Sequence, residues 1–170
     1  MNPSRILPDL QCSLVCEDVR QEVNGNFMVS GVLSLIRVPK IPVVAWRLFL
    51  FNRWTAGLGQ FHEAVRLVGP DQATVLRKGQ TQFVLENPAQ TMTNVTLFAQ
   101  VQLPAPGVYF IEVLVDDVMK LRYPLPVVVV QQPAGPAQAA APTPPDPGGS
   151  PAPEMPPAPP ASPPSSAPQR

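Results

Sequence analysis

The sequence has few of the residues that catalysis and metal binding most often use. It contains one histidine, His62, and two cysteines, Cys12 and Cys16, and only 14% of its 170 residues are charged. A Ser-His-acid site needs a histidine beside a nucleophile, and a zinc site needs four ligands or a Cys-x-x-Cys spacing. His62 lies in the middle of an expected strand, on its polar face, without either context. We therefore expect a protein that is not an enzyme and has no catalytic residue, metal site or cofactor.

Charge is scarce and also balanced. Lys plus Arg and Asp plus Glu number 12 each. Binding to a phosphate backbone or to an anionic membrane surface needs a concentrated basic face. The chain also lacks an apolar run near the ~18 residues of a spanning helix, and its first residues lack the unbroken apolar stretch of a secretory signal. We expect no nucleic-acid partner, no membrane partner and a cytoplasmic location.

The two cysteines agree with that location. Cys12 and Cys16 stand four residues apart in a stretch that reads as one strand, which places them roughly 13 Å apart on the same face. A disulfide requires a much shorter separation, so the sequence predicts two buried thiols in a reducing compartment.

Proline divides the chain into two parts. Of the 25 prolines, 15 follow Gln132, and Leu, Ile, Phe, Trp, Tyr and Val are absent from that stretch. Such a segment cannot bury enough apolar surface to offset chain entropy. We predict an N-terminal lead over 1–8, one β-domain over 9–131, and a disordered Pro/Ala-rich tail with polyproline II character over 132–170.

The clearest element is a hairpin between Gly107 and Val130. Apolar residues alternate along its first half, with Tyr109, Ile111, Val113 and Val115 on one face. Asp116-Asp117 then supplies turn residues, because Asp tolerates left-handed conformations. Pro124 and Pro126 cannot donate a backbone N–H, so the return strand should lie at an edge or bend there.

Other stretches show the same two-residue period, and none shows a helical one. Asn24-Gly25 marks a second hairpin turn. Near the end of the domain, 94–103 alternates cleanly and should turn Val95, Leu97 and Val101 inward, whereas Phe98 should point outward. The expected strands cover 10–18, 26–38, 43–54, 60–68, 73–76, 81–86, 94–103 and the 107–130 hairpin. This pattern predicts an all-β fold, an antiparallel β-sandwich of immunoglobulin-like type, with a partly open barrel as the alternative.

Both ends of this region carry recognisable motifs. Cys16-Glu-Asp-Val-Arg-Gln-Glu-Val-Asn-Gly-Asn-Phe followed by Gly31-Val-Leu, and Gly107-x-Tyr with the later Val-Asp-Asp and Pro124-Leu, form two separated signatures. They resemble the opening and the closing hairpin of a bacterial family of uncharacterised domains, over approximately 9–130. The resemblance implies a β-sandwich and a bacterial source, and it implies no activity.

The segment 43–54 has apolar residues on both faces. Trp46, Leu48 and Leu50 should share one face, while the other carries an arginine–aromatic stripe of Arg47, Phe49, Phe51 and Arg53. Ordinary packing is the first interpretation of this stripe. A protein interface such as a homodimer is the second, and stacking on a nucleic acid or a sugar is the third.

Acidic pairs and a glycosylation motif have simple interpretations. Asp116-Asp117 and Glu17-Asp18 could seat calcium, but solvated turns explain them better. Asn94-Val-Thr matches a glycosylation acceptor, which we interpret as a coincidence.

The function predicted from these observations is a non-catalytic protein-interaction or scaffold module. It would bind an unidentified protein partner, or a second copy of itself, through an edge strand or through Arg47, Phe49, Phe51 and Arg53. The alternative is a small-molecule or carbohydrate-binding sandwich that uses Trp54, Phe49 or Phe51.

The proline-rich tail could also bind a partner. It contains Pro-x-x-Pro spacings at 142–145 and 157–160, but SH3-type pockets read such motifs beside a basic residue, and the tail offers only Arg170. A spacer is favoured, and a role as a ligand stays open.

Overall fold

The computed structural model describes residues 5–130, and every regular element in that range is a β-strand. The strands are β1 (Asp9–Gln21), β2 (Phe27–Val32), β3 (Ile36–Val38), β4 (Val43–Thr55), β5 (Gly59–Val68), β6 (Val75–Leu85), β7 (Met92–Leu103), β8 (Gly107–Val115) and β9 (Val118–Val129). The all-β prediction is confirmed. No helix in this range could cross a membrane. The predicted tail lies outside the described residues.

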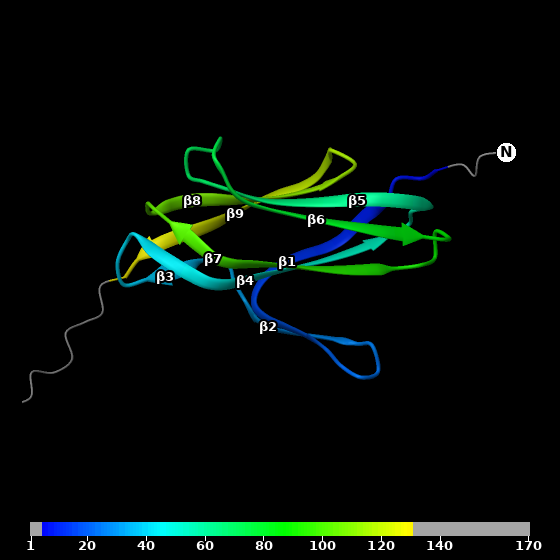
Figure 1. The fold of residues 1–170 in the computed structure, drawn as a ribbon, viewed down its shortest axis with the longest axis horizontal. Helices are drawn as coiled ribbons and strands as arrows, with labels where there is room; N and C mark the ends of the chain where they lie inside the picture. Colours follow the sequence, from blue (N-terminus) through cyan, green and yellow to red (C-terminus); the bar gives the residue numbers. More distant parts are fainter. Residues whose placement is uncertain (1–4, 131–170) are drawn as a thin grey trace, which may run out of the picture. The chain divides into compact units, whose positions relative to one another are not determined.

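The strands form two sheets that face each other. The four-stranded sheet has the order β2-β1-β4-β7, and the five-stranded sheet has the order β3-β9-β8-β5-β6. All neighbouring strands are antiparallel except β3 and β9, which run parallel. Figure 1 shows β5, β6, β8 and β9 in one layer and β1, β4 and β7 in the other. The fold is therefore two layers of extended chain around one core.

The core fills the space between the layers. On β8, the inward residues Tyr109, Ile111, Val113 and Val115 are at most 1% exposed, as the alternation predicts. They meet inward residues of the opposite sheet, and the apolar area removed from water here is the main stabilising contribution. The core cluster comprises Val15, Val38, Leu48, Leu50, Trp54, Phe61, Val65, Leu67, Phe83, Leu85, Phe98, Val101, Leu103, Tyr109, Ile111, Val113, Val115, Leu125 and Val127. Residues 5–130 thus contain this whole core.

The hairpin of β8 and β9 forms as predicted. Asp116 and Asp117 adopt φ values of 46° and 64°, the left-handed pair that a two-residue turn between antiparallel strands requires. β9 pairs with β3 only over Val127–Val129. Pro124 and Pro126 precede that ladder, so their missing N–H groups fall on a strand edge without a paired neighbour in the described part of the chain.

The prediction for β7 is wrong over its first half. Asn94 and Phe98 are buried, whereas Leu97 is 48% exposed. Gln100 has a left-handed φ of 49°, and beyond it Val101 is buried again. One left-handed residue moves the inward set by a single position. Alternation in the sequence cannot reveal such a residue, because it assumes an unbroken pleat.

β6 corrects a second expectation. The sequence suggests short strands over 73–76 and 81–86, yet β6 runs without a break through Gly79. A Cβ at Gly79 would collide with Thr96 of β7. The glycine therefore allows β6 and β7 to approach each other at one side of the fold, and it does not mark a turn.

The hairpin of β1 and β2 leaves the layers. β1 pairs with β4 from Asp9 to Cys16 and continues beyond that point with β2 alone. Figure 1 shows this hairpin on the side of the four-stranded sheet that faces away from the five-stranded sheet. At its base Gly31 has φ 64°, and a Cβ there would lie 2.6 Å from the Glu17 carboxylate. The tight base needs a residue without a side chain.

Candidate functional site

The arginine–aromatic stripe lies on the outer face of β4, opposite the core. Arg47 and Arg53 are exposed, and Phe49 is half-buried. Phe51, however, is only 7% exposed. The four side chains share a face, but only part of that face is open to a partner.

The chain itself covers Phe51. The ring of Phe27, at the start of β2, stands edge-on to the Phe51 ring with centroids 5.7 Å apart and planes at 74°. This geometry is favourable for two aromatic rings, because the positive edge of one meets the negative face of the other. The β1–β2 hairpin therefore uses the outer face of β4 as its own packing surface.

A continuous apolar row crosses the outer face beside this contact. Val32 of β2 is opposite Cys16 of β1, Cys16 is opposite Phe49, and Phe49 is opposite Leu97 of β7. Directly opposite residues share a face and touch. The two ends of the row are open, since Val32 is 58% and Leu97 is 48% exposed.

The largest exposed aromatic side chain is Trp46, which the sequence placed with the inward residues. Trp46 is 72% exposed, although Leu48 is buried two residues later. In the β4–β7 ladder, Ala45 pairs with Val101 and Arg47 pairs with Ala99, so Trp46 stands opposite the irregular residue Gln100. The left-handed residue that changes the inward set of β7 therefore also accounts for the position of the Trp46 side chain outside the core.

Trp46 stands at a hollow of about 470 Å³ that we name the Trp46 hollow. Its lining is Glu17, Leu33, Leu35, Ile36, Arg37, Ala45, Trp46, Arg47 and Leu48. The two arginine side chains are exposed, and neither forms an ion pair with a described residue. The hollow therefore combines an open indole, several apolar lining residues and two exposed guanidinium groups.

A second hollow of about 640 Å³ lies between the hairpin and the outer face. Gln21, Asn26 and Phe27 line it from the hairpin, and Arg53 and Thr91 line it from the sheet. Arg53 donates to the Thr91 hydroxyl at 3.3 Å. Arg53 is thus engaged locally, whereas Arg47 is not.

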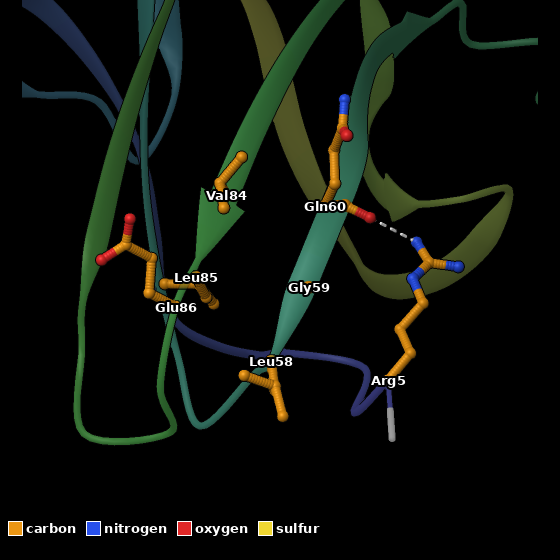
Figure 2. A pocket seen from close by; sticks show the side chains of 7 residues that line it. All are labelled: Arg5, Leu58, Gly59, Gln60, Val84, Leu85 and Glu86. Carbon is orange, nitrogen blue, oxygen red and sulfur yellow. Dashed lines mark hydrogen bonds between the residues drawn. The ribbon is translucent and has the colours of Figure 1, made fainter. Parts of the chain in front are cut away.

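Figure 2 shows a third concavity, about 650 Å³, beside the start of β5. Arg5 lies on one side of it, and Val84, Leu85 and Glu86 of β6 lie on the other. Arg5 is held in place: it donates to the Gln60 carbonyl at 2.7 Å and to Asp116, and its guanidinium lies 4.7 Å from the centre of the Phe61 ring. The lining of this concavity is largely apolar, and the Arg5 guanidinium already has partners in Gln60 and Asp116.

His62 is a surface residue of β5. Its side chain is 68% exposed, and its Nδ1 lies 3.7 Å from Asp116 Oδ1. Asp116 also accepts the His62 backbone N–H at 3.0 Å and the Arg5 guanidinium. The arrangement fastens the β8–β9 turn to β5 and to the N-terminal segment.

The two cysteines are free and differ in burial. Cys16 is fully buried and its thiol lies 3.5 Å from the Phe49 carbonyl oxygen, whereas Cys12 is half-buried. Burial raises the pKa of the Cys16 thiol to about 11, and the nearby Asp18 carboxylate acts in the same direction. Cys16 matches the predicted buried thiol, and Cys12 matches it only in part.

The interior holds a polar cluster around one carboxylate that the sequence pattern does not reveal. Glu63 of β5 is 1% exposed and points between the sheets. Asn52 donates to its Oε1 at 2.6 Å, Asn94 donates to its Oε2 at 2.6 Å, and the Trp54 indole N–H also donates to Oε2. The Asn52 Oδ1 atom is buried without a donor among the described residues. Glu63 thus joins β4, β5 and β7 across the core.

This cluster settles two other expectations. Asn94 is 6% exposed and bonded to Glu63, so its side chain is not accessible as a glycosylation acceptor. Trp54 is fully buried, so it cannot contact a carbohydrate. The sequence signal for the cluster was an acidic residue, Glu63, on an inward face together with Asn52, which shares the predicted inward face of its strand with Leu48 and Leu50. Asn94 gave no such signal, because the alternation placed it with the outward residues of 94–103.

The described residues contain no group of three or more His, Cys, Asp or Glu side chains placed to hold a metal ion. The Asp18 carboxylate accepts the Arg20 guanidinium at 2.6 Å. The acidic pair at 116–117 forms the tight turn described above.

Comparison with known proteins gives one family match. No curated protein matches the chain. The family DUF6941, a family of unknown function, matches residues 11–128, from within β1 to within β9. The match spans both layers of the fold. The predicted membership of an uncharacterised domain family is confirmed, and the chain belongs to the DUF6941 family.

Proposed function

We propose that this protein is a non-catalytic interaction module whose Trp46 hollow binds a protein partner. The observation that carries the proposal is the exposure of Trp46, 72%, between apolar lining and two exposed arginines. Tryptophan and arginine are the residues that most often dominate binding energy at protein interfaces. An indole of this size left in water gains substantially when a partner covers it.

The surroundings of the hollow extend the surface. Phe49 follows Arg47 on the outer face of β4, and Leu97 lies opposite Phe49 at 48% exposure. A partner seated on Trp46 could therefore also cover this apolar row. The predicted stripe contributes Arg47 and Phe49 to the interface, while Phe51 belongs to the packing of the hairpin.

We propose further that the two layers form an immunoglobulin-like sandwich. Two features support this assignment. β3 pairs in parallel with β9, the final strand, so the early part of the chain joins the sheet that contains the last strands. Near the start of β8, the Tyr109 hydroxyl donates to the Ala105 carbonyl at 2.7 Å, the arrangement called a tyrosine corner in such folds. A cytoplasmic location in a bacterium completes the proposal.

The test compares matched variants as bait. The full chain, Trp46→Ala and Val75→Ala would be tagged and used to capture proteins from source cells. Val75 is 47% exposed at the start of β6, in the other sheet, and serves as the control. A partner retained by Val75→Ala and lost by Trp46→Ala supports the proposal. Equal capture by all three baits would overturn it.

A second copy of the chain is a partner that the same variants test. Sedimentation of the purified full chain would show concentration-dependent association, and Trp46→Ala would abolish it. Association that survives this substitution would place the self-contact on another surface.

Ligand binding is the second candidate, and the concavity in Figure 2 favours it. Its volume of about 650 Å³ falls in the range of small-molecule sites, and Leu58, Val84 and Leu85 give it an apolar lining. A carbohydrate would bind elsewhere, by stacking on the exposed Trp46 indole. Quenching of tryptophan fluorescence by a glycan panel, lost in Trp46→Phe, would favour carbohydrate binding at Trp46 over a protein partner.

A further inference from the structure

The Trp46 hollow lies where strand β4 loses one of its two neighbours. Over residues 49–54, β4 pairs with β1 on one side and with β7 on the other. Over residues 43–48, β7 is its only strand partner in the described part of the chain. Residues 45–48 of this half-paired stretch line the hollow. The hollow therefore runs along a free edge of β4.

This edge is free because β1 turns away into the hairpin with β2. Cys16 is the last residue of β1 opposite β4. The segment after β2 lines the hollow through Leu33, Leu35 and Ile36, but no backbone hydrogen bond joins it to residues 43–48. Every second residue of an edge strand directs its N–H and C=O away from its one partner. Residues 43–48 therefore offer backbone groups to a strand position that no described residue fills.

The charges at this edge favour an acidic occupant. Arg37 and Arg47 line the hollow from β3 and β4, and both are exposed. Among the described residues of the lining, Glu17 is the single acid, and its carboxylate packs against Gly31 at the base of the hairpin. β7 carries no charged residue at all. A carboxylate placed beside Arg47 would gain a charge-assisted hydrogen bond and meet a complementary potential.

The two sides of β4 differ at this edge, so the occupant should alternate. Trp46 and Leu48 point to one side of the strand, and Arg47 points to the other. Side chains of a strand laid beside β4 would share these sides with their neighbours. One set would cover the indole, and the next set would meet the guanidinium. An extended segment in which large apolar residues alternate with Asp or Glu matches both sides.

We propose that the Trp46 hollow binds an extended acidic segment of the protein partner, which pairs as an added strand with residues 43–48 of β4. The apolar side chains of the segment cover Trp46, and its carboxylates meet Arg47 and Arg37. In this mode of recognition the main-chain hydrogen bonds give affinity, and the alternate side chains give specificity. The inference rests on the proposed function and specifies the chemistry of its partner.

The first experiment adds a synthetic peptide to the ¹⁵N-labelled full chain and follows the indole N–H signals of the two tryptophans, assigned with Trp46→Phe. The peptide is acetylated and amidated, and Glu alternates with Val and Phe along it. The Trp46 signal should shift saturably. The Trp54 signal should not move, because Trp54 is buried and bonded to Glu63.

A peptide of the same composition with its Glu residues grouped at one end is the matched control. It should bind at least about tenfold more weakly, because its side chains cannot match both sides of β4 at once. Equal binding by the two peptides, or a Trp46 signal that ignores both, would overturn the proposal.

N-methylation of the alternating peptide tests the strand pairing. Methyl groups on the Glu amides block one edge of the extended peptide, and methyl groups on the Val and Phe amides block the other. One methylated peptide should bind as tightly as the parent, and the other should bind at least about tenfold more weakly. Equal binding by all three peptides, or loss of binding by both methylated forms, would show that no single edge of the peptide meets β4.

Charge reversal tests the arginine contact. Arg47→Glu should weaken binding of the alternating peptide about tenfold, and it should strengthen binding of a peptide with Lys in place of Glu. Lys78→Glu makes the same change in net charge at an exposed position of β6 and should leave both affinities unchanged. Equal losses in the two variants would assign the effect to net charge and overturn the contact.

The two proposals fail separately when Arg47→Glu joins Trp46→Ala and Val75→Ala as bait. A partner that is lost by Trp46→Ala and retained by Arg47→Glu, in a chain whose Trp46 signal ignores the alternating peptide, would overturn only the acidic strand. Baits that lose nothing, in a chain whose Trp46 signal follows the alternating peptide, would overturn only the protein partner.

Discussion

The two faces of β4 look similar in sequence and behave differently in the structure. The inner face carries Leu48, Leu50 and Trp54, and the outer face carries Phe49 and Phe51. The inner residues meet the opposite sheet, whereas Phe51 is covered by Phe27 from a hairpin of the same sheet. An aromatic stripe on a strand therefore does not identify an interface. Whether such a stripe is open to a partner depends on which distant segment of the chain covers it.

The inner face also buries polar groups, which need hydrogen-bond partners in the core. The Asn52 amide N–H and the Trp54 indole N–H are buried, and both donate to Glu63. A buried charge without partners is strongly destabilising, but a carboxylate that accepts several N–H bonds can stand in a core. The outer face has no such requirement, because its contact with the hairpin is apolar.

The largest effect should come from breaking the inner cluster. Glu63→Ala leaves three buried donors without an acceptor, and each buried unsatisfied group costs about 1–3 kcal/mol. We expect a loss of about 3–5 kcal/mol in the free energy of unfolding, measured in urea.

The exposed residue Glu86 supplies the matched control. Glu86→Ala should change stability by less than about 0.5 kcal/mol. Glu63→Gln should fall between the two, because an amide keeps one acceptor and places an N–H against another donor. A mild Glu63→Ala variant would mean that the cluster contributes little to the fold.

The outer face should show the next largest effect. Phe51→Ala removes a ring that is 93% buried by the sheet and the hairpin, so a loss of about 3 kcal/mol is expected from thermal or urea unfolding. If the stripe were a free interface, the same substitution would have almost no effect on stability.

A double-mutant cycle with Phe27→Ala isolates the contact between the hairpin and the sheet. The coupling energy between the two rings should be about 0.5–1.5 kcal/mol. Additive losses would show that Phe51 is buried without help from Phe27, and the hairpin would then be only loosely attached.

The thiols report on the same outer face. Cys16 is buried beside Phe49, and its thiol has a pKa of about 11, so its reactive thiolate is scarce at neutral pH. At every pH below this pKa, the thiolate fraction of Cys16 increases about tenfold per pH unit. Iodoacetamide at pH 8 should modify Cys12 much faster than Cys16, as read by mass spectrometry. Equal rates would show that the outer face opens.

Much of the fold could be predicted from two-residue alternation and turn residues. The hairpin of β8 and β9, its Asp116-Asp117 turn and its inward residues follow from local chemistry. β7 could not be predicted in the same way. Its inward set changes at Gln100, whose left-handed conformation has no glycine or asparagine to announce it.

The candidate site was less predictable than the fold. Which residues of β4 share a face is a local property, and Arg47 and Phe49 were found by it. The exposure of Trp46 depends on an irregularity in the neighbouring strand, and the burial of Phe51 depends on a hairpin that begins more than twenty residues earlier in the chain. Such contacts are set by topology, which alternation within one strand does not contain.

The smallest effect on stability should come from Trp46, and it separates an interface residue from a packing residue. Trp46→Ala removes an indole that is 72% exposed, so the free energy of unfolding should change by less than about 0.5 kcal/mol. Trp54→Ala provides the contrast, since it should cost more than about 3 kcal/mol. Fluorescence adds a second readout: without Trp46, the remaining emission of the buried Trp54 should move to shorter wavelength. A Trp46→Ala variant as unstable as Phe51→Ala would make the hollow a packing site of the fold, because a side chain that a partner is to cover should contribute little before the partner arrives.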